Sequence, residues 1–477
     1  MSNLSELLPA GAGAKSADFV ASGTLGSGVT VVLKADGTVE VVSGAAEGVG
    51  TPVVFDTGNA QFTSATYDSN SNKVVVAYRD QSSTGYGTAV VGTVSGTSIS
   101  FGSSVYFNSS ATFETSATFD SNSNKVVIVY RDNGNSNYGR AVVGTVSGTS
   151  ISFGSTVLFN SAYSQYMAAT FDSNSNKVVV AYLDGGQAFY GTAKVGTVSG
   201  TSISFGSAVV YESSSAPFTR MAFDSNSNKV VITYYDAGNS NRGTAVVGNV
   251  SGTSISFGTA VVFQASLVVY PPVTFDSNSN KIVIAYQNSG NSNYGTAIVG
   301  TVSGTSISFG SAVVFNSAFS SYESAVFDSN TNKVVVAYAD GGTTGKVIVG
   351  TVSGTSISFG SPTTFNSAAT SHLSATYDVT NSKVVMAYAD DGNTQDGTSV
   401  VFQVGATNSA DFIGITDQAI ADTATGAVIV QGGVSEKVTG LTTGSDYYVQ
   451  SDGTLSTTVS SAPAGRALST TSILLEG

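Results

Sequence analysis

A long internal repeat dominates this chain and limits the folds that it can adopt. Successive copies begin 52 residues apart, except for a last step of 50 residues. The motif is Asp-Ser-Asn-Ser-Asn-Lys in five copies, has Thr for the second Ser at Asp328, and is degenerate at Asp378. The five regular copies begin at Asp68, Asp120, Asp172, Asp224 and Asp276. Seven units of this length indicate an array of small supersecondary units.

Each copy divides into four predicted strands, which we name A to D in chain order. In the second copy they cover 115–120, 125–132, 140–146 and 150–159. The A–B and C–D turns, Ser-Asn-Ser-Asn and Ser-Gly-Thr, use residues that tolerate tight turns. Gly154 lies inside strand D and predicts a bulge there, because glycine within a strand commonly marks one.

Strand B is apolar on both faces, since Val126, Ile128 and Tyr130 alternate with Val127 and Val129. Both faces must therefore be covered. A two-sheet sandwich covers one face of each sheet, whereas a β-propeller stacks each four-stranded blade between two neighbours. An open β-solenoid is the rival, but its repeats are usually shorter. We predict an all-β fold, a seven-bladed β-propeller with a small C-terminal β-domain.

The two ends of the repeat region complement each other. The Val-Ser-Gly-Thr-Ser-Ile-Ser hairpin occurs six times, and the seventh copy stops after its strand C at 398–405. Residues 29–55 match a C–D hairpin, so we expect the N-terminal segment to supply the outer strand of the last blade and to remove an exposed edge. A C-like strand then occurs eight times, so one copy has another role, such as pairing with the C-terminal module.

The chain therefore has three expected regions: an N-terminal segment at 1–28, the propeller at 29–405 and a C-terminal β-module at 406–477. The last of these contains short apolar stretches separated by turn signals such as Gly432-Gly433 and Asp452-Gly453.

The loops are of two kinds. The A–B and C–D turns hardly vary, whereas the B–C loops and D-to-A connections, expected on the opposite face, vary and carry aromatic or basic side chains. Function commonly resides in loops on a rigid scaffold, and aromatic rings stack on apolar sugar faces while their polar tips form hydrogen bonds. We predict a glycan or protein contact surface there; the alternative is that these rings only cap the blades.

The candidate ligand-binding residues are Tyr86, Tyr138, Tyr163, Tyr166, Tyr190, Arg220, Arg242, Tyr270, Tyr294 and Tyr322. The same loops also contain Phe62, Phe113, Phe189, Phe218, Phe319 and His372.

An acidic residue ends strand B in most copies, namely Asp80, Asp132, Asp184, Asp236, Asp340 and Asp390, with Asn288 in the fifth. A ring of carboxylates could bind a cation, but Asp also opens turns by accepting backbone N–H bonds, which is the interpretation we favour.

The turn that begins at Asp68 has oxygen-bearing side chains at alternate positions, as calcium loops do. Val76 stands where an acidic ligand would be expected, and the glycine of such loops is absent. We therefore expect a plain hairpin turn with a contact between Lys73 and Asp68, and we predict no metal site and no cofactor.

Composition excludes several functions. The formal net charge of -13 disfavours nucleic-acid binding. There is no cysteine and a single histidine, His372, so thiolate and multi-histidine metal sites are excluded. The sequence contains no run of 18 apolar residues, so we expect no membrane insertion. The N-terminus does not have the pattern of a secretory signal.

Catalytic motifs are also missing. There is no Gly-x-Ser-x-Gly elbow and no phosphate-binding glycine loop. Glycosidases need two positioned carboxylates, which the strand-end Asp residues could supply, but the near-equivalence of all copies argues against one specialised site. Sialidase-like propellers cluster arginines at their centre, whereas Arg79 and Arg131 have no obvious third partner. We therefore expect a protein that is not an enzyme.

The termini carry a more specific resemblance. The stretch 438–449, followed by Asp452-Gly453-Thr454-Leu455-Ser456 and Ala464-Gly465-Arg466-Ala467-Leu468-Ser469, is similar to the terminal module of tailed-bacteriophage virion proteins of marine type. Leu4–Pro9 and Phe19–Gly23 resemble the starts of such proteins. The resemblance implies a tail-fibre, appendage or head-decoration protein, made in the host cytoplasm and carried on the virion. No catalytic residue carries over from it.

On this resemblance, segment 1–28 docks on the virion, and module 406–477 serves virion attachment or oligomerisation. The expected partners are other virion proteins and host-surface polysaccharide, with a homo-oligomer left open. The alternatives are a secreted bacterial adhesin or matrix protein and a propeller glycosidase.

Overall fold

The computed structural model describes residues 15–476. The chain forms two compact units, Gly48–Gln403 and Met1–Glu47 together with Val404–Gly477. The expected boundary at residue 28 therefore moves to residue 47, because segment 29–47 belongs with the C-terminal module. Within the described residues the fold is all-β, its helices are single 3-10 turns, and none is long and apolar enough to cross a membrane.

Every repeat has the same strand order. In the second repeat, β12 (Lys125–Asp132) pairs with the end of β11 (Val105–Asp120) on one side and with β13 (Tyr138–Ser147) on the other. The outer edge of β13 pairs first with β14 (Ser150–Phe153) and then with the start of β15 (Val157–Asp172). All of these pairs are antiparallel.

The corresponding strands recur along the chain. The B strands are β8 (Lys73–Asp80), β12, β16 (Lys177–Asp184), β21 (Lys229–Asp236), β26 (Lys281–Asn288), β30 (Lys333–Asp340) and β35 (Lys383–Asp390). The C strands are β9 (Tyr86–Ser95), β13, β17 (Tyr190–Ser199), β22 (Arg242–Ser251), β27 (Tyr294–Ser303), β31 (Thr344–Ser353) and β36 (Asp396–Gln403).

Strand D differs from its expected form in one respect. The interruption predicted at Gly154 is present, since β14 ends at Phe153 and β15 starts at Val157. Beyond it the strand does not stop: β15 runs as one strand through the outer edge of one repeat and into the inner strand of the next. The same continuity occurs in β11 and in β29 (Val313–Asp328), whereas the other four D-to-A connections are interrupted between two strands.

Strand B is buried on both faces, as its sequence predicts. Val75 and Ala77 of β8 share one apolar cluster with Val126, Ile128 and Tyr130 of β12, so neighbouring repeats pack face to face. A Phe or Tyr of the preceding outer strand packs on the fully buried Tyr of strand B in every repeat. These ring pairs are Phe55–Tyr78, Phe107–Tyr130, Phe159–Tyr182, Tyr211–Tyr234, Phe263–Tyr286, Phe315–Tyr338 and Phe365–Tyr388.

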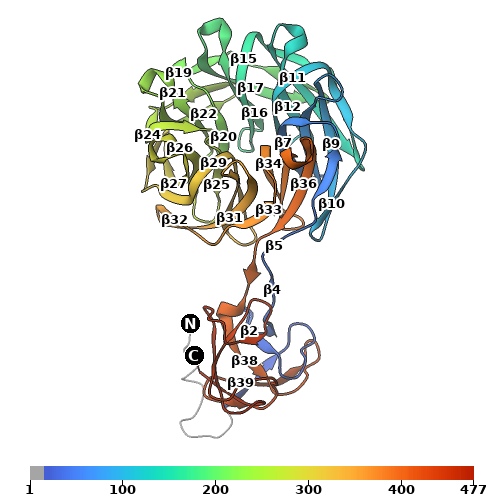
Figure 1. Ribbon diagram of the computed structural model, residues 1–477, viewed down its shortest axis with the longest axis vertical. Helices are drawn as coiled ribbons and strands as arrows, with labels where there is room; N and C mark the ends of the chain where they lie inside the picture. Colours follow the sequence, from blue (N-terminus) through green and yellow to red (C-terminus); the bar gives the residue numbers. More distant parts are fainter. Residues whose placement is uncertain (1–14, 477) are drawn as a thin grey trace. The chain divides into compact units, whose positions relative to one another are not determined.

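The N-terminal segment completes the seventh repeat. β5 (Gly48–Val49) and β6 (Val53–Asp56) pair with β36, so the predicted supply of an outer strand is confirmed. The seventh repeat also packs on the first, because Val385 and Ala387 lie in one cluster with Tyr78. The repeats are arranged round a common centre as a repeat-built propeller (Figure 1).

Glycine at the bend of strand D allows close contact between repeats. A Cβ atom on Gly154 would overlap the carbonyl oxygen of Thr201, in the C–D turn of the next repeat. The same overlap occurs at Gly50, Gly102, Gly206, Gly258 and Gly310. Gly360 differs: its nearest heavy atom is 3.8 Å from a built Cβ, because the seventh repeat has no C–D turn.

The second unit contains two five-stranded sheets. The first has the order β1 (Ser16–Val20), β39 (Thr425–Val430), β38 (Phe412–Thr416), β2 (Thr30–Leu33) and β3 (Val39–Val41). The second has the order β40 (Val434–Ser435), β44 (Ile473–Leu475), β43 (Pro463–Ala467), β41 (Asp446–Val449) and β42 (Leu455–Ser456). Val32, Ile415 and Ile429 of the first share a core with Val449 and Ile473 of the second.

This arrangement accounts for the eighth C-like strand, β2, which pairs with β38 instead of joining the repeats. The expected docking segment 1–28 is likewise not a separate arm where it is described, since β1 is an edge strand of the same sheet. The motif at Leu4–Pro9 lies outside the described residues.

Candidate functional site

One residue in each D-to-A connection has a left-handed backbone conformation, with φ between 43° and 57°. We call these seven residues the ring positions: Phe62, Glu114, Tyr166, Phe218, Tyr270, Tyr322 and His372. Such φ values are unfavourable for bulky L-residues, and positions of this kind concentrate at functional sites.

The local sequence produces this conformation in two ways. In five repeats the ring position lies in a β-bulge, where the register against strand B shifts, as between Phe113 and Ser116. In the fourth and fifth repeats the strand breaks. Pro217 precedes Phe218, and Pro271 and Pro272 follow Tyr270. Proline cannot donate a ladder hydrogen bond, so these breaks follow from the sequence.

The aromatic ring positions contact one another in sequence. The ring centroids of Phe62 and His372 are 4.9 Å apart, and those of His372 and Tyr322 are 5.7 Å apart. Tyr322 stacks on Tyr270 at 6.0 Å, and Tyr270 packs on Phe218 at 4.5 Å.

The chain of contacts continues from Phe218 to Tyr166, whose ring centroids are 4.9 Å apart. At the seventh position, the carboxylate of Glu114 accepts a hydrogen bond from the backbone N–H of Tyr166. Six rings and one carboxylate therefore follow each other round the centre of the repeats.

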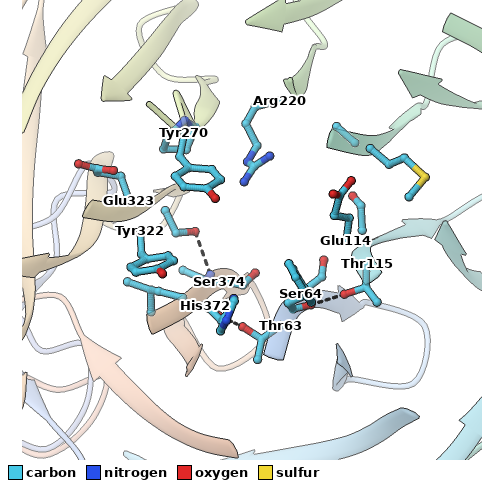
Figure 2. A pocket seen from close by; sticks show the side chains of 18 of the residues that line it. Thr63, Ser64, Glu114, Thr115, Arg220, Tyr270, Tyr322, Glu323, His372 and Ser374 are labelled. Atoms are coloured by element: carbon cyan, nitrogen blue, oxygen red, sulfur yellow. Dashed lines mark hydrogen bonds between the residues drawn. The ribbon is translucent and has the colours of Figure 1, made fainter. Parts of the chain in front are cut away.

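All of the ring positions except Phe218 line a cavity of about 390 Å³, a size typical of small-molecule sites. Figure 2 shows that Arg220 and the rings of Tyr270 and Tyr322 face it. The cavity mixes apolar ring faces with a guanidinium, carboxyl groups and hydroxyls. This combination suits a ligand that has both apolar faces and many hydroxyls.

The position two residues after each ring position separates the repeats into two groups. In four repeats it is Ser, whose hydroxyl oxygen accepts a backbone N–H from the next repeat. The pairs are Ala117 to Ser64, Ala169 to Ser116, Ala375 to Ser324 and Ala65 to Ser374. In the third, fourth and fifth repeats it is Ala168, Arg220 and Pro272. The regular contact is thus replaced in three consecutive repeats.

Arg220 is the cation of the cavity. One of its guanidinium nitrogens donates to the carbonyl of Thr219 at 2.9 Å, and its Cζ lies 5.4 Å from the centroid of the Tyr270 ring. Burial lowers the pKa of Arg220, and Tyr270 and Glu114 oppose that shift. No ion pair of Arg220 occurs among residues 15–476.

Glu114 is held by a second arginine. Arg131 lies 3.3 Å from one carboxylate oxygen of Glu114, and its other amino group donates to the Tyr163 hydroxyl. Burial raises the pKa of Glu114, while Arg131 lowers it by a smaller amount. Arg79 and Arg131 both stack on the Phe113 ring, at 4.0 Å and 4.6 Å. Glu114 is therefore oriented from outside the cavity.

Two more titratable groups line the cavity. Burial lowers the pKa of His372 to about 4, so its imidazole is neutral at pH 7. Burial raises the pKa of Glu323 to about 7. The carboxyl of Glu323 points away from Arg220 (Figure 2), and within the described part of the chain neither of its oxygens makes a hydrogen bond of ordinary geometry.

The structure divides the ten predicted site residues. Tyr166, Arg220, Tyr270 and Tyr322 come together in the cavity. Tyr163 lies behind it, on Arg131. The other five begin C strands and are not among the residues that line the cavity: Tyr86, Tyr138, Tyr190, Arg242 and Tyr294.

Sequence reasoning did not single out Glu114, Glu323 or the inter-repeat serines. Glu114 stands 52 residues after Phe62 and 52 before Tyr166. An alignment of the repeats with each other would therefore have placed Glu114 at the same position as Phe62 and Tyr166.

The strand-end acids act mainly as turn formers. Asp184 accepts from the backbone N–H of Gly186, and Asp236, Asn288 and Asp390 make comparable bonds. Asp132 differs, because it pairs with Arg140 at 3.0 Å. Asp340 likewise pairs with Lys346.

The turn at Asp68 is a hairpin closed by backbone N–H groups. The Asp68 carboxylate accepts from Asn70 and Ser71 at 2.9 Å and 3.0 Å. Asp68 and Lys73 are paired opposite each other at the end of the β7–β8 hairpin, although no ion pair joins their side chains within residues 15–476. The described residues also contain no cluster of His, Cys, Asp and Glu that could hold a metal ion.

No protein-family model and no curated protein matches the sequence. Solved structures match the fold. The BP39L lectin from Burkholderia pseudomallei has 11% identity and a TM-score of 0.53, over 74% of this chain and 98% of its own. The β-propeller domain of Cps50 (Swd1) from Myceliophteria thermophila has 7% identity and a TM-score of 0.49, over 74% of this chain and all of its own. At such low identity the similarity concerns the fold alone.

Proposed function

We propose that this chain is a non-enzymatic carbohydrate-binding protein. The seven repeats together form a seven-bladed β-propeller, which is closed by β6 of the N-terminal segment. Glycan binds in the cavity at the ring positions. The terminal unit holds it on the virion of a tailed phage, as a tail-fibre, appendage or decoration protein. Its partners there are other virion proteins and host-surface polysaccharide.

One observation carries the binding proposal. The repeats are nearly identical in strand B and in both hairpin turns, yet the seven ring positions hold Phe, Glu, Tyr, Phe, Tyr, Tyr and His. Residues that only capped the blades would have no reason to differ between equivalent blades. Aromatic rings with carboxyl, guanidinium and hydroxyl groups beside them match a sugar, which has apolar C–H faces and polar edges.

The virion proposal rests on the termini. The segments that resemble phage virion proteins, including Phe19–Gly23 and 438–449, fold into one unit separate from the repeats. Such a unit provides an attachment body that leaves the repeat fold unchanged. Self-association of the protein is proposed to occur through this unit.

A glycan array and binding to intact bacterial cells test the binding proposal. The comparison is between the wild type, the double variant Tyr270→Ala/Tyr322→Ala and a control, Tyr294→Ala, outside the cavity. We expect binding by the wild type and the control, and its loss in the double variant, with all three shown to be folded by circular dichroism. Absence of binding by folded wild-type protein would reject the proposal.

The virion proposal has its own test. Mass spectrometry of purified particles of the phage that encodes the chain should detect the repeat peptides in amounts comparable with known structural proteins. Their absence from intact particles would reject the virion role and leave the secreted adhesin as the alternative.

A further inference from the structure

Resting on the carbohydrate-binding function proposed above, we infer that the cavity takes an acidic sugar and that Arg220 binds its carboxylate. The ligand class is a glycan that contains a uronic acid or another sugar acid, rather than a neutral glycan.

Arg220 has unused hydrogen-bonding capacity in the cavity. A guanidinium has five N–H donors in a planar fork, and the hydrogen bond from Arg220 to the Thr219 carbonyl uses one of them. A cation taken from water without a counter-ion is unfavourable. Arg131 and Arg140, by contrast, are paired with Glu114 and Asp132, and Arg79 stacks on the Phe113 ring outside the cavity.

The position of Arg220 also departs from the rule of the repeat. Equivalent serines in four repeats each bond a backbone N–H of the next repeat. Arginine in this place gives up that contact and directs a guanidinium to the cavity, beside Tyr270 (Figure 2). The neighbouring repeats give up the same contact, through Ala168 and Pro272. The regular contact is thus missing in the repeat that carries Arg220 and in the repeats on either side of it.

The groups round Arg220 fit the rest of such a sugar. A guanidinium fork matches a planar carboxylate with two parallel hydrogen bonds. The rings of Tyr270 and Tyr322 line the same cavity and provide aromatic surface for the C–H face of the pyranose. Glu114 lines the same cavity and, held by Arg131 and by the Tyr166 N–H, can accept hydrogen bonds from sugar hydroxyls.

Arginines are confined to one end of the repeat strands. Arg79 and Arg131 are the penultimate residues of their B strands and stand opposite the D-to-A connections, while Arg242 begins a C strand. The lysines that start the B strands, such as Lys125, lie at the opposite end, beside the A–B turns. The acidic residues that end the B strands lie at this end too, so the attraction for a carboxylate comes from Arg220 inside the cavity rather than from the net charge of this end.

The test compares each glycan with its carboxyl-reduced form. Isothermal titration is carried out with oligogalacturonate, oligomannuronate and sialyllactose, each with its reduced counterpart, and with dextran sulfate as a non-carboxylate polyanion. The proteins are wild type, Arg220→Gln, Arg220→Lys and the control Arg242→Gln, all checked by thermal unfolding.

We expect at least one acid to bind at least about tenfold more tightly than its reduced form, the loss typical of removing a charged hydrogen bond. Arg220→Gln should abolish this preference, Arg220→Lys should restore part of it, and Arg242→Gln should keep it. Three outcomes would overturn the inference while leaving carbohydrate binding intact. The protein could bind the acid and its reduced form equally well, or bind only neutral glycans of the array. It could also bind dextran sulfate as tightly as the acidic glycans, with an affinity that Arg220→Gln does not change. Failure of the folded wild type to bind any glycan rejects the proposed function and this inference with it.

Discussion

Tyr270 and Tyr322 occupy the same ring position in adjacent repeats, and their rings lie nearly parallel, with 19° between planes and 6.0 Å between centroids. The other ring-position pairs are tilted or T-shaped. Theirs is therefore the one near-parallel contact among the ring positions. It lies between the cation at Arg220 and the imidazole of His372.

Removal of one of these rings should weaken glycan binding. We expect Tyr322→Ala to reduce affinity about three- to tenfold, because an aromatic contact contributes about 0.5–1.5 kcal/mol beyond its buried area. Tyr322→Phe should keep most of the affinity, since it retains the ring. Titration with the best array glycan measures both, and an equal loss in the two variants would show that the hydroxyl, not the ring face, matters.

The buried carboxyl of Glu323 should make stability depend on pH. Its folded pKa, about 7, is above the ordinary value of 4.5, so the folded state holds this proton more strongly than the unfolded state. The cost of burying the charge therefore begins as pH rises above 4.5 and is complete above about 7, where it amounts to about 3 kcal/mol.

Glu323→Gln removes that cost. The melting temperature of the variant should match the wild type near pH 4.5 and exceed it increasingly up to pH 7, with a constant difference above that. Glu436→Gln, at an exposed position in the other unit, controls for the change in net charge. A difference that is independent of pH would contradict the assignment.

The bend glycines offer a matched pair of substitutions. Gly154→Ala should destabilise the protein by about 2 kcal/mol or more, because the new methyl group meets the backbone carbonyl of Thr201. Gly360→Ala should be nearly neutral, since nothing lies closer than 3.8 Å to its Cβ. Urea unfolding monitored by fluorescence measures both. Similar losses in the two variants would mean that strand D itself, rather than the contact between repeats, requires glycine.

The hydrogen bond from the Ala65 N–H to Ser374 joins the first repeat to the seventh at 2.9 Å. Ser374→Ala should lower stability by about 1 kcal/mol and speed hydrogen exchange in β7 (Ala60–Asp68) and β34 (Thr370–Asp378). Ser116→Ala, at an internal junction, should have a similar energetic effect but should speed exchange in β11 and β15. Exposed Ser69→Ala is the control, and faster exchange at the same strands in all three would refute the assignment.

Much of the fold follows from local patterns. The repeat is visible in the sequence as a period of 52 residues. The doubly apolar strand B and the turn at Asp68 are each determined by a few adjacent residues. The missing outer strand of the seventh repeat was also predictable, because Val53–Asp56 repeats the pattern of the other outer strands. The boundary at residue 47 was not predictable from local patterns. It depends on β2 pairing with β38 rather than with a repeat, and β2 does so because Val32 shares a core with Ile415 and Ile429.

The site was only half predictable. Tyr166, Tyr270, Tyr322 and Arg220 were identified because aromatic and basic residues vary between copies. Tyr86 has the same chemistry but begins strand C, and residue type alone does not distinguish that position from the cavity. Glu114 belongs to the site because of its backbone geometry. It occupies the same left-handed position in its repeat as Phe62 does in the first repeat, and this conformation is a property of the fold rather than of the residue type.

The pairing of β6 with β36 also governs when the protein can fold during synthesis. β6 is among the first segments of the repeat unit to leave the ribosome, and its partner strand is the last. The six intervening repeats can form while β6 still lacks its partner. The fold can be completed only after Asp396–Gln403 has left the ribosome. A nascent chain that stops before that point exposes an unpaired strand, which can pair with another chain.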